Sequence, residues 1–436
     1  MKNINNGKRL TGEKKRATGR DAGIATPRFA AVMASQALSL LGMEILQFVL
    51  PLHLLNLTGS GALYGGVVAA GFVPYTLLAP VGGVIADRTR KRGVMVAVGA
   101  ALAAAMVDYL PLAGTLAVVP ATVAVLMLAF AAQALEQPCV QSAIPHLVAP
   151  AEVERAVALV NQLGMLTGIG GPVVGGLAFG FFGLAPIVVA CVVCFAASAA
   201  VAAFAVRVPY EPPARTAGAL ATARADLAEA LGFLRSNPLM WRTILGATLV
   251  NLFGSSFFNV CSPYIVTETL GLSNQFMGAL QGALAAGGLV GGAVVAAAPG
   301  RFSIRSVPRL LACVAGGIAL VAAALAAPLP ALGTYAALVA LYLPTMAVCM
   351  CMSVVATSYL QMKSPGTLVG KVMALTLMPA NFATPLGQLA YGMALDLVPA
   401  WAIALTAAGA TVAVALWLAQ TAHEAQRQAG ASFSSR

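Results

Sequence analysis

Two carboxylic acids, Glu44 and Glu136, lie deep within long apolar segments of the sequence. No Lys or Arg lies inside any of these segments, so neither acid has a basic partner at the same depth. A carboxyl group without such a partner in a low-dielectric surrounding favours its neutral form. The sequence therefore predicts proton-binding groups, with Glu44 as the first candidate and Glu136 as the second. The alternative for each is an ordinary acid facing a water-filled vestibule.

Uncharged polar residues recur in the same apolar segments, in the company of aromatic ones. Amide groups among aromatic and aliphatic side chains suit a cavity for an amphipathic organic molecule. Hydrogen bonding between helices is the competing explanation for each residue alone. The sequence leaves open which of them share one cavity. The predicted cavity residues are Gln36, Gln47, Gln133, Asn251, Phe258, Asn259, Gln281 and Asn381.

Four other ionisable residues fall near the ends of apolar segments. Solvated or helix-capping roles are expected for the acids Asp108, Glu268 and Asp396. His53 could relay a proton, but the favoured interpretation is an imidazole that reaches the membrane interface.

The composition is that of a membrane protein. Of the 436 residues 60% are hydrophobic and 9% are charged, and the mean hydropathy is +0.88. Soluble domains carry about 25% charged residues. The net charge of +11 comes from basic residues dispersed between apolar segments. They form no continuous patch of the kind that binds nucleic acid, so no nucleic-acid partner is expected.

Catalytic and metal-binding patterns are missing from the sequence. The histidines at 53, 146 and 423 are scattered singly, without the companions that a membrane enzyme needs. The seven cysteines lie in or beside apolar segments, where small buried residues are expected. Residues 366–371 lack the first glycine and the final Ser or Thr of a P-loop. We therefore expect neither an enzyme nor an ATP-driven pump, and no metal or cofactor.

Sustained apolar runs of about 20 residues predict membrane-spanning helices rather than strands. The fold class is therefore an all-α membrane protein with twelve transmembrane helices. The predicted spans are 29–56, 62–86, 93–112, 116–139, 155–181, 184–205, 242–267, 274–298, 309–327, 331–357, 371–395 and 400–421.

Basic residues predict the orientation of these spans. All 25 Lys and Arg residues lie in the two tails or in alternate connections, and the other connections have none. Basic loops stay in the cytoplasm, so both termini are predicted to be cytoplasmic. The predicted regions are a basic cytoplasmic tail (1–28), a six-helix bundle (29–205), a cytoplasmic linker with an amphipathic helix (206–241), a second six-helix bundle (242–421) and a short cytoplasmic tail (422–436).

The two bundles resemble each other in sequence, which predicts two six-helix pseudo-repeats. Gly59 aligns with Gly271, and Gly66 aligns with Gly278. Later in each half, Gly171 aligns with Gly387 and Gly176 with Gly392. A parallel duplication of this kind is shared by many secondary transporters.

A charged loop joins the second and third predicted spans. Its pattern resembles the loop signature of the major facilitator superfamily, although Arg90 stands where that signature usually has glycine. The resemblance implies a gating loop that holds the outward-facing state closed at the cytoplasmic side. The alternative is a topology signal that also contacts lipid headgroups. The matching residues are Gly83, Asp87, Arg88, Lys91 and Arg92.

The fifth predicted span carries Gly171, Pro172, Gly175 and Gly176, similar to the GPxxGG core of a motif found in antiporters of this superfamily. Glycines of this kind allow a second helix to approach closely. Residues 152–159 and 370–375 look like the multidrug-efflux branch that includes macrolide exporters and the enterobactin exporter.

These resemblances imply a secondary transporter of the bacterial inner membrane that works by alternating access. We expect proton-coupled efflux of hydrophobic or cationic drugs, driven by the proton gradient. The alternative is export of an endogenous metabolite such as a siderophore. The expected partners are a small-molecule substrate, protons and the lipid bilayer, and the protein is expected to be a monomer.

Overall fold

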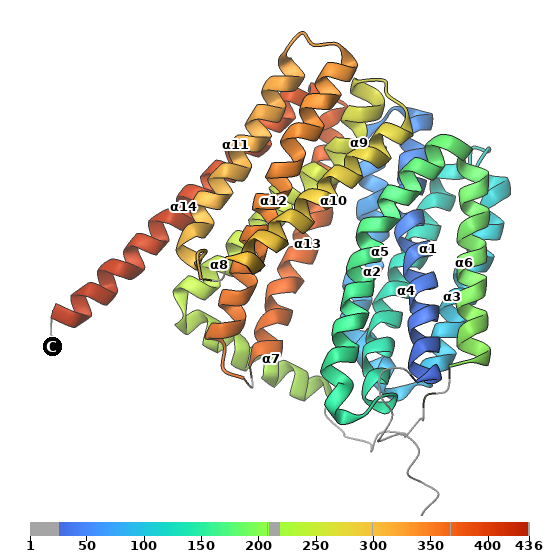
Figure 1. Ribbon diagram of the computed structural model, residues 1–436, viewed down its shortest axis with the longest axis horizontal. Helices are drawn as coiled ribbons and strands as arrows, with labels where there is room; N and C mark the ends of the chain where they lie inside the picture. Colours follow the sequence, from blue (N-terminus) through green and yellow to red (C-terminus); the bar gives the residue numbers. More distant parts are fainter. Residues whose placement is uncertain (1–25, 207, 209–218, 299, 367, 435–436) are drawn as a thin grey trace, which may run out of the picture.

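The computed structural model describes residues 26–434 except 207, 209–218, 299 and 367. The side chains of 80, 81, 83–87, 219–227 and 421–434 also lie outside the description. Every regular element in the described part is helical (Figure 1).

Six long helices precede the linker. Several of them contain a proline, such as Pro51 and Pro172, which membrane helices tolerate because neighbouring helices satisfy the freed backbone groups. Their bounds are α1 Pro27–Thr58, α2 Gly61–Arg88, α3 Lys91–Leu112, α4 Val118–Ala143, α5 Val153–Phe182 and α6 Leu184–Phe204.

The later helices begin with α7, Ala219–Ser236, where the sequence predicts the linker helix. Helix α8, Pro238–Val250, continues through two π-helical segments, Asn251–Ser255 and Phe257–Cys261, then α9, Ser262–Tyr264, and a third π-helical segment, Ile265–Thr269. The remaining long helices are α10 Asn274–Ala297, α11 Val307–Ala326, α12 Ala331–Lys363, α13 Val369–Leu395 and α14 Ala400–Ser434.

Eleven helices in the described part are long and apolar enough to cross a membrane. They correspond to eleven of the predicted spans. The predicted span 371–395 is helix α13, with 27 residues, which is not among the eleven. Its Lys371, Asn381 and Gln388, together with Pro379 and Pro385, lower its hydropathy. The count of twelve spans therefore stays a prediction.

Helix pairing follows the same scheme before and after the linker. Helix α2 packs on α4, and α10 packs on α12. Helix α3 packs on α6, and α11 packs on α14. Gly59 and Gly271, which align in the sequence, both adopt φ of +64° just after the first span of each group, a conformation that favours glycine. The two groups, α1–α6 and α8–α14, therefore have equivalent arrangements.

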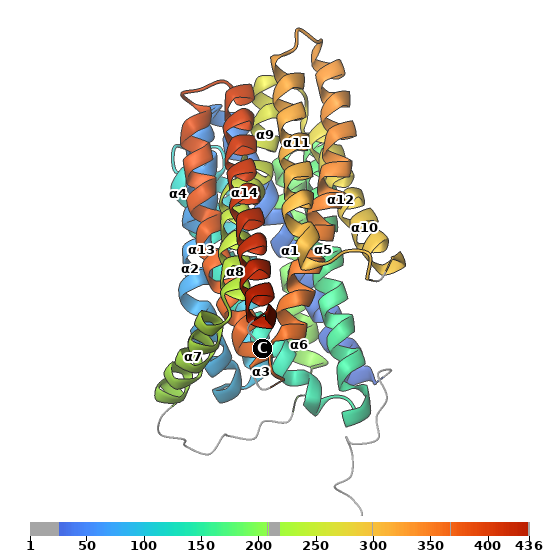
Figure 2. The ribbon, with the colours of Figure 1, turned by 90° about the vertical axis from the view of Figure 1, so that its left-hand side faces the viewer.

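The two ends of the molecule differ in charge. The α2–α3 and α4–α5 connections and helix α7 lie at one end, which is called the basic end after Arg88, Arg90, Lys91 and Arg92 of the α2–α3 connection (Figure 2). The opposite end carries Asp108, Glu268 and Asp396 and is called the acidic end. In Figure 1 the two helix groups converge toward the acidic end, at the top, and diverge toward the basic end.

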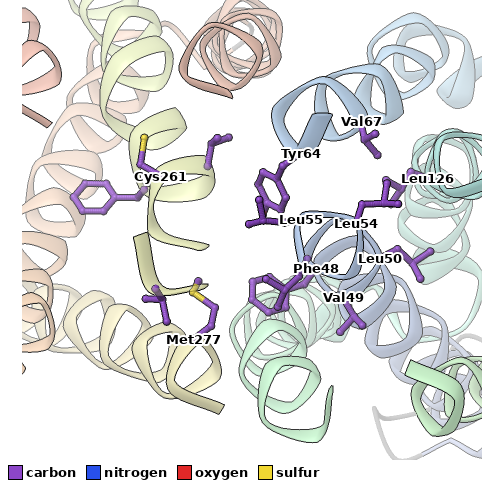
Figure 3. Packing of buried hydrophobic residues seen from close by; sticks show 14 of the residues in the cluster. Phe48, Val49, Leu50, Leu54, Leu55, Tyr64, Val67, Leu126, Cys261 and Met277 are labelled. Atoms are coloured by element: carbon purple, nitrogen blue, oxygen red, sulfur yellow. The ribbon is translucent and has the colours of Figure 1, made fainter. Parts of the chain in front are cut away.

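One buried apolar cluster joins the two groups near the acidic end. It contains Phe48 of α1 and Tyr64 of α2 from the first group, and Cys261 and Met277 from the second. Figure 3 shows these side chains facing one another across the boundary between the groups. The two helix groups are therefore packed most tightly against each other at the acidic end.

Candidate functional site

Glu136 is enclosed between α4 and α1. The residue is 2% exposed. The hydroxyl of Ser39 on α1 donates a hydrogen bond to Oε2 of Glu136 at 2.7 Å. Oε1 has no hydrogen-bond partner among the described residues. Because a buried ionised carboxylate needs several strong partners, this environment suits the neutral acid, with the second oxygen free to exchange a proton.

Glu44 lines a small polar cavity within α1–α6, which we call the amide cavity. Its volume is about 250 Å³. Two predicted cavity residues, Gln36 and Gln133, line it together with Glu44. Gln47 lies next to it, since its amide nitrogen donates to Oε1 of Gln133 at 3.5 Å. The structure therefore brings the first proton candidate together with three of the predicted polar residues.

Sequence reasoning missed three residues of the amide cavity, Gln137, Gln141 and Asn161. A signal for two of them was present, because Gln133, Gln137 and Gln141 follow one another at a spacing of four. That spacing places all three on one face of α4.

The glycine motif of α5 packs against the backbone of α1 at Glu44. A Cβ added at Gly171 would lie 2.3 Å from Cβ of Glu44, so the two backbones touch at this point. Gly175 lies one turn further along, against Ile45 and Val49 of α1. Pro172 lies between them within the helix. The motif therefore fixes the position of Glu44 through direct packing of α5 on α1.

Four more predicted cavity residues line a second cavity, among α8, its π-helical continuation, α10, α11 and α12. They are Asn251, Phe258, Asn259 and Gln281, and the volume is about 480 Å³. We call it the Met-lined cavity because Met346, Met350 and Met352 of α12 also border it. Asn381 lies on α13 and borders neither cavity. The predicted cavity set is therefore divided between the two helix groups.

The predicted gating loop lies at the basic end, where α2 ends at Arg88 and α3 begins at Lys91. Gly83 and Asp87 belong to α2, but their side chains lie outside the described residues. Arg90 adopts φ of −70°, which any residue can adopt, so glycine is not required there.

Three basic residues of this loop, Arg90, Lys91 and Arg92, border a hollow of about 980 Å³ with Arg28. Arg92 also donates a hydrogen bond to the carbonyl oxygen of Ala203, which ties the start of α3 to the end of α6.

At the acidic end, Asp396 bridges the two helix groups. Its carboxylate accepts hydrogen bonds from the backbone nitrogens of Gly61 at 2.6 Å and Ala62 at 3.1 Å, and from the Ser60 hydroxyl at 2.7 Å. Gly61 and Ala62 are the first residues of α2, so Asp396, at the end of α13, caps a helix of the other group. A capping role was one of its two expected roles, and the structure supplies the partner helix.

Two helix crossings, in which glycine meets glycine, also join the two helix groups. Gly176 of α5 meets Gly278 of α10, where an added Cβ would lie 2.7 Å from the opposing Cα. Gly392 of α13 meets Gly61 and Gly65 of α2, with an added Cβ 2.5 Å from the Gly61 carbonyl oxygen. Helix α5 corresponds to α13 and α2 to α10 in the repeat, so the two crossings are equivalent. Any opening of the acidic end must separate both.

The family model described as Major Facilitator Superfamily matches residues 32–388. The chain belongs to this superfamily. Its members are transporters, and this agrees with the absence of a catalytic set in the sequence. No curated protein matches the sequence. The narrower resemblance to macrolide and enterobactin exporters stays a prediction.

Solved structures of transporters share this superfamily fold. A bacterial homologue of the iron transporter ferroportin is 16% identical, with a TM-score of 0.67, over 90% of this chain and 98% of its own. A POT family transporter is 13% identical, with a TM-score of 0.67, and the match covers 92% of this chain and 98% of that transporter. A D-xylose–proton symporter is 15% identical, with a TM-score of 0.66, and the match covers 89% of this chain and 96% of that symporter. At these identities the likeness concerns the fold alone.

Replacing Gly171 by alanine should reduce both transport and stability, because the new methyl group would collide with Glu44 and force α1 and α5 apart. Overpacking of this kind costs about 1–3 kcal/mol. Gly170→Ala is the matched control, since nothing lies within 4 Å of a Cβ there. Thermal unfolding of the purified protein and transport in vesicles measure the two effects. Equal behaviour of the two variants would contradict the packing described here.

Replacing Asp396 by alanine should loosen the acidic end. Loss of a helix N-cap costs about 1 kcal/mol, which changes a population ratio roughly fivefold. Spin labels at Leu116 and Leu329, both exposed and on loops of different groups at the acidic end, should show a larger population at long separation. Asp108→Ala removes an exposed acid at the same end and should leave the distance distribution unchanged. An unchanged distribution in Asp396→Ala would exclude the cap as a determinant of closure.

Proposed function

We propose that this protein is a proton-coupled exporter of hydrophobic and cationic small molecules. It works by alternating access in a bacterial inner membrane, with twelve spans, the basic end and both termini in the cytoplasm, and the monomer as the functional unit. The observation that carries the proposal is Glu136, an acid enclosed in the first helix group with one hydroxyl partner and, among the described residues, one oxygen without a hydrogen bond. A group with this environment is suited to binding and releasing a proton.

Proton binding is linked to the conformational change because the two states of the transporter differ in the access of water to Glu136. In the arrangement seen here, Glu136 is enclosed, and the neutral acid is favoured because burial penalises its charge. A state that admits water to α1 and α4 would favour release of the proton. The protonated form of Glu136 is then more stable in one state than in the other. Protonation therefore shifts the equilibrium between the two states.

Glu44 has a different role in this mechanism. It lines the amide cavity among carboxamides, so its carboxylate can attract the cationic group of a substrate or exchange a proton with it. Competition between a cation and a proton for Glu44 links binding of one to release of the other. Export follows if the substrate enters from the basic end and leaves from the acidic end.

Glu136→Gln should abolish proton coupling, because the amide keeps the shape of the acid but cannot release a proton. Glu44→Gln should weaken transport of cations more than that of neutral molecules. Inverted membrane vesicles with an imposed pH gradient provide the measurement, as substrate-dependent collapse of the gradient. Glu154→Gln, at an exposed position on α5, is the control and should behave like the native protein.

Full proton-coupled transport in both Glu44→Gln and Glu136→Gln would exclude these acids as the carriers. The alternative function, export of an endogenous siderophore, predicts that the same vesicles accumulate a catechol siderophore and leave lipophilic cations outside.

A further inference from the structure

The Met-lined cavity is formed by one helix group. Its walls are α8 with the π-helical continuation, α10, α11 and α12, together with Ile304, Thr376 of α13, and Thr411 and Leu418 of α14. No residue of α1–α6 borders it. Its volume of about 480 Å³ falls within the range of about 300–1,000 Å³ that holds drug-sized ligands. It is therefore large enough to hold a substantial part of an organic molecule.

The described walls of this cavity carry no charge. Among the described residues, its lining contains no Asp, Glu, Lys, Arg or His. The polar groups are hydroxyls and carboxamides, and the amide nitrogens of Asn251 and Asn259 already donate to the carbonyls of Ala247 and Ser255, at 2.9 and 2.8 Å. The cavity thus offers carboxamide oxygens and apolar surface. A charged group placed here would lose its hydration without gaining a counter-ion.

Four sulfur-bearing side chains and one aromatic ring contribute to the apolar surface, beside aliphatic side chains. Met346, Cys349 and Met350 lie at positions i, i+3 and i+4 of α12, on one face of the helix, and all three line the cavity. Phe258 faces them from the π-helical segment and packs edge-on against Tyr342 of α12, with ring centroids 5.1 Å apart. Thioethers are flexible and polarisable and contact aromatic rings favourably. Walls of this kind adapt to flat apolar molecules of different outline.

The irregular backbone of the seventh predicted span faces the same space. Asn251, Gly254 and Ser255 belong to the first π-helical segment, and Phe258 and Asn259 to the second. π-Helical turns are rare and occur frequently at functional sites. The carbonyl of Asn259 also accepts a hydrogen bond from the Tyr64 hydroxyl of the other helix group, at 3.4 Å. The cavity wall is therefore connected to the crossing that closes the acidic end.

We propose that the Met-lined cavity binds the aromatic body of the transported molecule. This inference rests on the export function proposed above. It assigns the apolar part of substrate recognition to the helices after the linker. Because the Met-lined cavity responds to apolar surface and not to charge, neutral and cationic molecules with the same aromatic body share it.

Protection of a cysteine in the cavity wall tests this assignment. The variant Ser353→Cys, in a chain whose seven native cysteines are replaced, places one thiol at an exposed position in the lining. The probes are tetraphenylphosphonium, neutral triphenylphosphine oxide and tetraethylammonium, which has charge but no aromatic ring. At about ten times its Kd, either aromatic probe should slow labelling by N-ethylmaleimide about tenfold, and tetraethylammonium should not.

A matched control retains only Cys313, an exposed thiol of α11 outside the cavity lining, and its labelling should be unaffected by every probe. Both variants are used after they show transport in vesicles. If tetraphenylphosphonium is exported with proton coupling while Ser353→Cys labels at the same rate with and without it, the cavity assignment is wrong and the export function stands. If no probe is exported by the native protein, the export function fails independently of labelling.

A second variant tests the sulfur contacts without altering the volume of the cavity. Met346→Leu combined with Met350→Leu conserves apolar volume but removes both thioethers. It should raise the KM for tetraphenylphosphonium about threefold or more. Met393→Leu, at an exposed position of α13 that does not border the cavity, should leave the KM unchanged. An equal KM in all three proteins would overturn the role given to the thioethers.

Discussion

Close contact between glycines of the two helix groups is the constraint on which this structure depends. At the acidic end α5 meets α10 through Gly176 and Gly278, and α13 meets α2 through Gly392 and Gly65. Side chains at these points would hold the groups apart, and the cap of Asp396 on α2 could not form. Because lipid provides no hydrophobic drive between helices, close backbone contact and hydrogen bonds supply the attraction. The close backbone contacts and the hydrogen bonds are both concentrated at the acidic end, and they must break for this end to open.

The same kind of contact positions Glu44, the acid of the amide cavity. Gly171 lies on the α1 backbone at Glu44, and Gly176, five residues later on the same helix, lies on α10. One helix therefore contacts both the acid-bearing helix and the opposite group. A shift of α5 during opening must change the surroundings of Glu44. In this way a short run of glycines connects the amide cavity to the movement of the two groups.

Much of this arrangement could be predicted from the sequence. Eleven predicted spans are helices long and apolar enough to cross a membrane, since membrane hydropathy is a local property of about 20 residues. The superfamily was also predictable, because its signature residues lie close together in the chain, within residues 83–92. Which of the polar residues face a cavity was not predictable. Gln36 and Gln281 each line one and Asn381 lines neither, because the rotation of each helix decides what its amide faces. The π-helical turns around Asn251 and Phe258 gave no sequence signal.

The sequence by itself determined which segments are long and apolar enough to cross a membrane, which connections carry positive charge, and where acids without basic partners occur. These properties depend on residue type and on spacing over one span. Only the tertiary structure decided that Gly171 touches Glu44, that Asp396 caps α2, and that Met346 and Met350 border the same space as Phe258. Each of these contacts joins residues far apart in the chain. Their formation depends on how whole helices cross and rotate, and this follows from packing over many residues at once.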